Sequence, residues 1–240
     1  MEGRSIGLVP TMGALHRGHA SLVSRCRAEN DGVVVTLFVN PTQFNDPADL
    51  NRYPRTLKSD LSFLESLGTD EVFVPEASAL YPNGYAFRVV SDSLSAVMEG
   101  RHRPGFFDGV MTVVLKLLNL VRADRSYFGE KDFQQWKVLH DMAADLFIST
   151  EIIRCPTIRA ASGLAESSRN ALLSPQGRER AAAIYRALTT AVSAVEAGAA
   201  LEAEGFRVDY VEEHWGRRFA AAFLEGIRLI DNVPLEDSKS

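Results

Sequence analysis

Two histidines in the stretch Pro10–His19, which reads PTMGALHRGH, are the side chains best suited to chemistry in this chain. An apolar run, Ile6–Val9, precedes the stretch, and a segment with helical spacing, Ala20–Ala28, follows it. This pattern predicts a turn from a strand into a helix. Gly13 and Gly18 let the backbone approach a ligand closely. The first turn of such a helix attracts anions, so a phosphate group is the expected ligand.

His16 and His19 stand three positions apart. If the helix has begun by Leu15, both side chains project from one face of its first turn. Imidazoles placed there would donate hydrogen bonds to a phosphoryl oxygen as its charge grows during transfer. A metal pair and a structural helix start are the alternatives. A catalytic zinc site needs a third ligand, which the HxGH spacing lacks and no nearby Cys/His cluster supplies.

Neutral amides follow the next predicted strand. The run Gly32–Val39 is rich in β-branched residues without polar alternation, as in a central strand covered on both faces. Asn40 and Gln43 come directly after it. Because ligands gather at the carboxyl ends of parallel strands, both amides are expected near the phosphate site. The alternative is a plain turn, since Asn-Pro is common turn chemistry.

A third candidate segment is GEKDFQQ, Gly129–Gln135, which follows a short predicted strand, Arg125–Phe128. Lys131 and Asp132 are expected in the first turn of the next helix, with Gln135 one turn further on. All three would then face the same end of the sheet.

The last candidates lie in loops. Ser167, Ser168 and Arg169 follow Gly163 and would offer two hydroxyls and a guanidinium, a set suited to polyphosphate, although a simple polar loop is the alternative. The arginines of the predicted loop 101–109, RHRPGFFDG, would either meet phosphates or stay in solvent.

The elements that must position these residues alternate between strand and helix. We predict a helix at Leu57–Leu67, carrying Asp60, after an irregular loop at 46–54, and a strand at Glu71–Pro75. A helix at Val110–Leu120 and a strand at Thr150–Pro156 continue the alternation, which predicts an α/β fold with a doubly wound parallel sheet.

The C-terminal part differs in pattern. Ser174-Pro175 begins a predicted alanine-rich helix that reaches about Val195. Beyond it, alternating segments at 206–211 and 227–230 predict a small α+β unit. We therefore expect two domains, residues 1–160 and 161–240.

Composition limits the function classes. The chain has 240 residues, 46% of them hydrophobic, and a formal charge of -5, which gives no support for nucleic-acid binding. No segment predicts a signal peptide or a membrane span. The two cysteines, Cys26 and Cys155, lie far apart without a CxxC motif, so we expect a reducing cytoplasm.

Taken together, PTMGALHRGH, VNPTQF, RYPRT, GEKDFQQ and SSRN, in this order, closely resemble the pantothenate synthetase family. VDYVE and RLIDN near the end also resemble the family's small C-terminal domain, so the resemblance covers nearly the whole chain. It implies a Rossmann-like fold of the HIGH-type nucleotidyltransferase class with a small α+β C-terminal domain. The implied activity is the ATP-dependent ligation of pantoate and β-alanine through a pantoyl adenylate, which releases pyrophosphate and AMP.

The resemblance also implies residue roles. His16, His19, Lys131 and Arg169 match the catalytic set, and Asn40, Gln43 and Gln135 match positions that hold pantoate. The expected ATP-binding set comprises Pro10, Thr11, Met12, His16, Gly18, His19, Gly129, Lys131, Asp132, Ser167, Ser168 and Arg169. Mg²⁺ is expected with ATP, with Asp60 as the candidate ligand, and the family implies a homodimer.

The chain departs from the family pattern in two active-site loops and at its ends. Phe106 replaces the histidine of RPGHF, Ala160 and Ser162 replace an acidic pair, and Glu166 replaces an apolar residue. The N-terminus looks trimmed and the C-terminal region reduced. These changes bear on acceptor specificity, so the alternatives are a related adenylyltransferase, a ligase with another acid and amine, or an ATP-binding protein that has lost catalysis.

Overall fold

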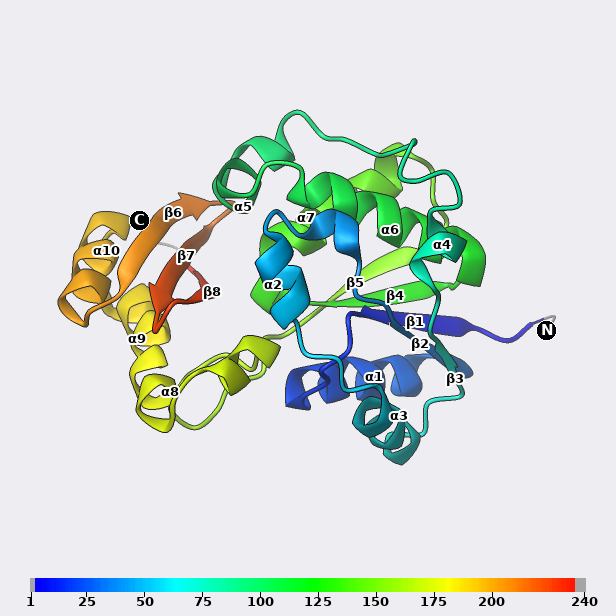
Figure 1. Ribbon diagram of the computed structural model, residues 1–240, viewed down its shortest axis with the longest axis horizontal. Helices are drawn as coiled ribbons and strands as arrows, with labels where there is room; N and C mark the ends of the chain where they lie inside the picture. Colours follow the sequence, from blue (N-terminus) through cyan, green and yellow to red (C-terminus); the bar gives the residue numbers. More distant parts are fainter. Residues whose placement is uncertain (1–2, 236–240) are drawn as a thin grey trace. The chain divides into compact units, whose positions relative to one another are not determined.

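The computed structural model describes residues 3–235 and divides the chain into two compact units, residues 1–156 and 157–240. Figure 1 shows the course of the chain through both. The division lies a few residues before the boundary predicted at residue 160. Within the described residues, no helix combines the length and the apolar character needed to cross a membrane.

The first unit contains a five-stranded parallel sheet with the order β3-β2-β1-β4-β5. Its strands are β1 (Ile6–Thr11), β2 (Gly32–Leu37), β3 (Glu71–Phe73), β4 (Arg125–Gly129) and β5 (Glu151–Cys155). The predicted doubly wound sheet is confirmed. The chain runs outward from β1 to β3 and then returns to β4 beside β1, and ligands of open α/β sheets bind at the strand ends next to such a reversal.

Helices cover both faces of this sheet (Figure 1), with α1 (Arg17–Glu29) and α3 (Leu57–Ser66) on one face and α6 (Phe106–Val121) and α7 (Phe133–Asp145) on the other. Side chains alternate along β1, so Leu8 lies in the core with residues of α6 and α7, whereas Val9 lies in the core with residues of α1. Both faces of β1 are therefore buried, and its carboxyl end is held at a fixed place.

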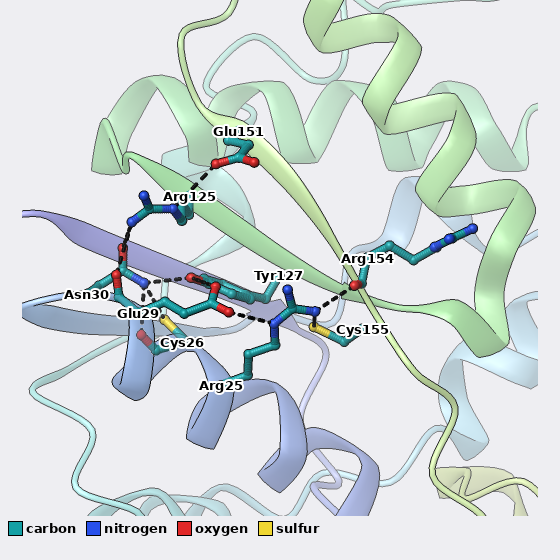
Figure 2. Close-up of polar contacts among 9 residues, drawn as sticks. All are labelled: Arg25, Cys26, Glu29, Asn30, Arg125, Tyr127, Glu151, Arg154 and Cys155. Atoms are coloured by element: carbon teal, nitrogen blue, oxygen red, sulfur yellow. Dashed lines mark hydrogen bonds and ion pairs between the residues drawn. The ribbon is translucent and has the colours of Figure 1, made fainter.

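A polar network ties the second half of α1 to β4 and β5 (Figure 2). The Tyr127 hydroxyl donates to Glu29 Oε2 at 2.9 Å, and Arg25 Nε donates to Glu29 Oε1 at 2.9 Å. Arg25 Nη1 also donates to the Arg154 carbonyl oxygen at 2.8 Å and contacts Cys155 Sγ at 3.7 Å. Because these bonds cross from helix to sheet, they fix α1, and with it the turn that carries the two histidines.

The two cysteines are free and buried on this side of the sheet. Burial is the main cause that raises the pKa of the Cys26 thiol to about 12, and burial also raises the pKa of Cys155. Both thiols are therefore protonated at neutral pH and unreactive. A Cβ at position 7 would lie 2.2 Å from Cys26 Sγ, so this position of β1 needs glycine.

The second unit contains an antiparallel sheet of β6 (Arg207–His214), β7 (Arg217–Leu224) and β8 (Ile227–Pro234). Two-residue turns at Trp215-Gly216 and Glu225-Gly226 join the strands, and all four residues have positive φ, as tight hairpins require. The helices are α8 (Pro175–Ala181), α9 (Ala183–Thr190) and α10 (Ala194–Ala203), of which α9 and α10 pack against the sheet. The predicted small α+β unit is confirmed.

Several predicted boundaries are wrong. Segment 46–54 is not an irregular loop, because Asp46 accepts the Ala48 N–H at 2.8 Å and begins α2 (Pro47–Arg52). The predicted loop 101–109 contains the end of α5 (Met98–His102) and the start of α6, which begins at Phe106 after Gly105 with φ +79°. A further short helix, α4 (Ala77–Leu80), was not predicted.

The predicted single helix from Ser174 to Val195 is also wrong. The chain leaves helical geometry at Ala191, where the buried Arg218 guanidinium bonds to the carbonyl oxygens of Leu188, Ala191 and Val192. A charged side chain that caps these carbonyls ends α9. Sequence reading also missed β7, because its alanine-rich run, Arg217–Leu224, lacks strong β-formers at its centre.

Candidate active site

The turn after β1 is held by a buried carboxylate. Asp60 of α3 is 4% exposed and accepts the N–H groups of Ala14 at 3.0 Å and Leu15 at 2.9 Å. The Thr56 hydroxyl donates to the same carboxylate at 3.0 Å. Gly13 and Ala14 have φ values of +79° and +51°; glycine adopts such values readily, whereas at Ala14 they cost energy without such support. Asp60 therefore fixes the backbone that leads directly into His16.

The two histidines begin the helix themselves. Helix α1 starts at Arg17, so His16 is its N-cap and not part of its first turn as predicted. His16 Nδ1 accepts the Gly18 N–H at 3.1 Å, and His19 Nδ1 accepts the His16 N–H at 3.3 Å. The ring centroids are 4.1 Å apart. This is a capping box in which both capping side chains are imidazoles.

The capping box determines where each neutral imidazole carries its proton. Because both Nδ1 atoms accept backbone N–H groups, the hydrogen of each neutral ring must sit on Nε2. Burial, followed by the charge of Lys131, lowers the pKa of His16 to about 4. Burial, His16 and Lys131 lower the pKa of His19 to about 3. At neutral pH the turn therefore offers two preorganised Nε2–H donors.

These shifted pKa values predict a specific acid sensitivity. Both values lie below the ordinary 6.5, so the unfolded chain takes up protons first as the pH falls below 6.5. Stability is therefore lost from pH 6.5 down to about 4 for His16 and down to about 3 for His19. At pH 5 we expect a loss of about 2 kcal/mol for each histidine. Urea unfolding of the parent and of His19→Gln, measured at pH 7 and pH 5, checks this.

The variant supplies the control, because glutamine retains the capping bond but does not titrate. Between pH 7 and pH 5, the free energy of unfolding of His19→Gln should fall by about 2 kcal/mol less than that of the parent. An equal loss in both proteins would contradict the assignment.

Lys131 and Asp132 lie in a 3₁₀ turn, Glu130–Asp132, that leaves β4 at Gly129. Helix α7 begins only at Phe133, so Lys131 and Asp132 precede its first turn instead of forming it, and Gln135 lies in the first turn and not one turn further on as predicted. Lys131 Nζ lies 3.6 Å from Asp132 Oδ1, and its side chain is 17% exposed. Its charge lowers the pKa of both imidazoles, so the structure places Lys131 close to the turn that carries His16 and His19, the histidine turn.

Gln43 lies in a 3₁₀ turn, Pro41–Gln43, that follows β2. Its Nε2 lies 3.0 Å from Met12 Sδ, which joins it to the end of β1. Its Oε1 accepts a bond from Asn40 Nδ2 at 3.1 Å. Asn40 is 1% exposed and its amide bonds to the protein on both sides, and its predicted contact with the acid stays a prediction.

The departure at Phe106 has a structural role. Its ring lies under the Arg103 guanidinium, 3.8 Å from ring centroid to Cζ. Arg103 Nη2 donates to the Gln43 carbonyl oxygen at 3.1 Å, and Nη1 lies 3.7 Å from Glu99 Oε2. Phe106 therefore supports an arginine that holds the backbone of Gln43. The sequence predicted that the arginines of this segment either meet phosphates or stay in solvent, and it did not predict this contact of Arg103 with the backbone of Gln43.

The SSRN segment belongs to the second unit. Ser167 Oγ accepts the Arg169 N–H at 3.3 Å and caps a 3₁₀ turn, Ser168–Leu172. Asn170 Nδ2 donates to the Ala165 carbonyl oxygen at 2.9 Å. Ser167, Ser168 and Arg169 are each partly exposed, and Glu166 is half-buried. The segment is thus built as a fixed turn, and its predicted grip on phosphate stays a prediction.

The loop before SSRN is anchored to its own sheet. Arg159 donates to both carboxylate oxygens of Asp231, which is 5% exposed, and its guanidinium lies 4.0 Å from the Tyr185 ring centroid. Ala160 and Ser162 form the following turn, in which Ser162 is exposed. These substitutions therefore fall on a tight turn at the surface of the unit.

Asp60 does not fit the role of a direct magnesium ligand. Three donors of the protein already bind its carboxylate. Over residues 3–235, no group of three or more His, Cys, Asp or Glu side chains is arranged to hold a metal ion. Its position behind the turn indicates a structural task instead. Sequence reading missed this task because it depends on a contact between segments 45 residues apart.

Comparison with known proteins identifies close relatives over almost the full length. A family model described as pantoate-beta-alanine ligase matches residues 1–234. A pantothenate synthetase from Bdellovibrio bacteriovorus is 49% identical over 234 residues, which cover 98% of this chain and 93% of the relative. One from Cereibacter sphaeroides is 50% identical over 258 aligned positions, covering 97% of this chain and 92% of the relative.

Solved structures give the same result. The pantoate-beta-alanine ligase of Francisella tularensis, complexed with beta-gamma ATP and beta-alanine, has a TM-score of 0.94 at 41% identity and covers all of this chain and 93% of that one. Pantothenate synthetase from Thermus thermophilus has a TM-score of 0.90 at 42% identity, covering 96% and 93%. The predicted HIGH-type nucleotidyltransferase fold is confirmed. Since the family model and these relatives span nearly the whole sequence, the chain belongs to the pantoate-beta-alanine ligase family.

Proposed function

We propose that this chain ligates pantoate and β-alanine to pantothenate at the expense of ATP, through a pantoyl adenylate. Membership of the family supports the reaction, and the ATP and β-alanine in the Francisella tularensis complex support the substrates. The observation that carries the proposal is the pair of neutral imidazoles at a helix start beside Lys131. These groups suit a polyphosphate whose charge must be stabilised during transfer.

In the first step, a carboxylate oxygen of pantoate attacks the α-phosphorus of ATP, and the bond to the β-phosphate oxygen breaks. Pyrophosphate leaves with the electron pair. The Nε2–H groups of His16 and His19 would donate to phosphoryl oxygens, and the Lys131 ammonium would offset the growing negative charge. Neutral imidazoles suit this task because they donate without releasing a proton at neutral pH.

In the second step, the amine of β-alanine attacks the acyl carbon, and AMP leaves with the electrons of the acyl–oxygen bond. The amine loses a proton, and pantothenate is formed. Arg169, Ser167 and Ser168 are proposed to bind phosphate oxygens of ATP, because a guanidinium and two hydroxyls suit them. We assign no magnesium ligand among residues 3–235, and Mg²⁺ is proposed to enter with the triphosphate.

Exchange of labelled pyrophosphate into ATP tests this function. The exchange should require pantoate and should proceed without β-alanine, because it reports the adenylation step alone. Exchange with another acid would indicate a diverged ligase. Exchange that needs a phosphorylated acceptor would indicate a related adenylyltransferase. ATP binding without any acid-dependent exchange would indicate a protein that has lost catalysis.

Gln135→Ala is expected to weaken pantoate binding about tenfold while ATP binding stays within about twofold, because one amide bond to a charged oxygen is lost. Separate calorimetric titrations of the two ligands measure this. Gln135→Glu should weaken pantoate more strongly, since a carboxylate repels the acid. Equal weakening of pantoate and ATP would mean that the acid binds elsewhere.

We further propose a homodimer in a reducing cytoplasm. The free, buried cysteines are consistent with a reducing compartment. Sedimentation of the purified chain tests the dimer.

A further inference from the structure

We propose that Asn40 and Tyr81 are positioning residues that fix the amide of Gln43, so that Gln43 offers N–H donors to the acid. This inference rests on the proposed function, because it concerns how that site distinguishes an oxyanion from an amine. It assigns Asn40 an indirect role and gives Tyr81 a role in the reaction.

Two backbone groups determine the orientation of the Asn40 amide. Asn40 Nδ2 donates to the Gly109 carbonyl oxygen at 3.1 Å, and Asn40 Oδ1 accepts the Thr42 N–H at 3.4 Å. A backbone carbonyl can only accept and a backbone N–H can only donate. A reversed amide would lose both bonds inside a site where Asn40 is 1% exposed.

Hydroxyl groups reinforce this orientation. The Tyr81 hydroxyl donates to Asn40 Oδ1 at 2.8 Å, and the Thr42 hydroxyl donates to the same oxygen at 3.0 Å. Lys116 Nζ lies 5.1 Å from the Tyr81 ring centroid, and the Phe38 ring packs nearby. Tyr81 is therefore held in place to support the amide oxygen of Asn40.

The fixed amide of Asn40 in turn determines the orientation of the Gln43 side-chain amide. The second Nδ2 hydrogen of Asn40 requires an acceptor, so the atom of Gln43 that lies 3.1 Å away must be Oε1. The NH₂ group of Gln43 then points to the other side, where Nε2 donates one hydrogen to Met12 Sδ over an N–S distance of 3.0 Å. Gly109 permits this arrangement, since a Cβ there would lie 2.5 Å from the Thr42 carbonyl oxygen.

The consequence is a chemical preference. With Oε1 bonded to Asn40, the remaining group of Gln43 is an N–H donor, which suits a carboxylate or hydroxyl oxygen. The same group disfavours an ammonium, which has only donors. Arg103 Nη2 donates to the Gln43 carbonyl oxygen, which fixes the backbone from which this side chain extends.

Two variants and one control test the proposal by steady-state kinetics with pantoate and ATP varied separately. Tyr81→Phe removes one of the donors to Asn40 and should raise the KM for pantoate about threefold to fivefold, equivalent to the net value of one hydrogen bond. Asn40→Asp cannot donate, so Gln43 must turn its NH₂ group inward and present Oε1 to the acid. That change should raise the KM for pantoate at least about tenfold, or 1.4 kcal/mol.

The KM for ATP should stay within about twofold in both variants. Tyr85→Phe is the matched control: its ring packs against Tyr81, and its buried hydroxyl has no hydrogen-bond partner within residues 3–235. It should behave like the parent. A pantoate KM in Tyr81→Phe equal to the parent's would overturn the proposal, as would equal rises for pantoate and ATP or the same effect in Tyr85→Phe. If Asn40→Asp does not fold, the pantoate KM of Tyr81→Phe alone tests the proposal. If the parent protein shows no pantoate-dependent exchange of pyrophosphate into ATP, the proposed function is contradicted instead.

Discussion

Replacing His19 with glutamine is expected to lower the rate of pantoate-dependent exchange of pyrophosphate into ATP by roughly a hundredfold or more, as for loss of one preorganised donor to a transition state. The glutamine oxygen can still accept the His16 N–H, because glutamine occupies this position in ordinary capping boxes. The helix start is therefore kept while the distal Nε2–H donor is lost. Exchange at saturating ATP and pantoate measures the effect.

His19→Ala removes the capping bond as well as the donor, so its rate should fall by a similar factor and its stability by about 1 kcal/mol more. His140→Ala is the control, because His140 lies on α7 with a side chain that is 51% exposed. A folded His19→Gln protein as active as the parent would refute the proposed role of the histidine turn. His16→Ala should also lower the exchange rate by roughly a hundredfold.

Replacing Asp60 with alanine is expected to reduce both stability and exchange. Two backbone N–H groups, of Ala14 and Leu15, lose a charged acceptor inside the protein. The free energy of unfolding should therefore fall by about 2 to 4 kcal/mol. The turn also loses the support for positive φ at Ala14, so His16 should shift and the exchange rate should fall by at least about tenfold.

Asp60→Asn separates this explanation from a magnesium role. An asparagine oxygen can accept one of the two N–H groups, so stability and rate should lie between those of the parent and Asp60→Ala. Titrating Mg²⁺ at fixed ATP should give the same half-saturating concentration in all three proteins. A large rise in the Mg²⁺ requirement, reversed at high Mg²⁺, would instead make Asp60 a metal ligand.

Local patterns were sufficient to predict the parallel sheet and the histidine turn. The run Gly32–Val39 has the composition of a strand buried on both faces, and β2 occupies most of it. The Pro10–His19 stretch lies between a strand and a helix, as predicted. Both features depend on neighbours in sequence, so their periodicity and glycine content determine them.

What the sequence did not indicate depends on contacts between distant segments. Arg218 ends α9 through carbonyl groups that lie about 30 residues earlier. Tyr81 reaches Asn40 across 41 positions. Asp60 was a candidate magnesium ligand, and the sequence did not show the two N–H groups that its carboxylate binds. Such partners have no local pattern, and only the folded chain brings them together.

The residue that is best for stability at the N-cap position of α1 differs from the residue that the proposed reaction needs there. Serine, threonine or aspartate would cap α1 at least as well as an imidazole, because a short side-chain oxygen is the common N-cap acceptor. Those residues end at the capping atom and carry no donor beyond it. In a library randomised at positions 16 and 19, selection for solubility or heat resistance should therefore enrich serine and aspartate at position 16, whereas selection for growth that depends on the enzyme should retain histidine at both.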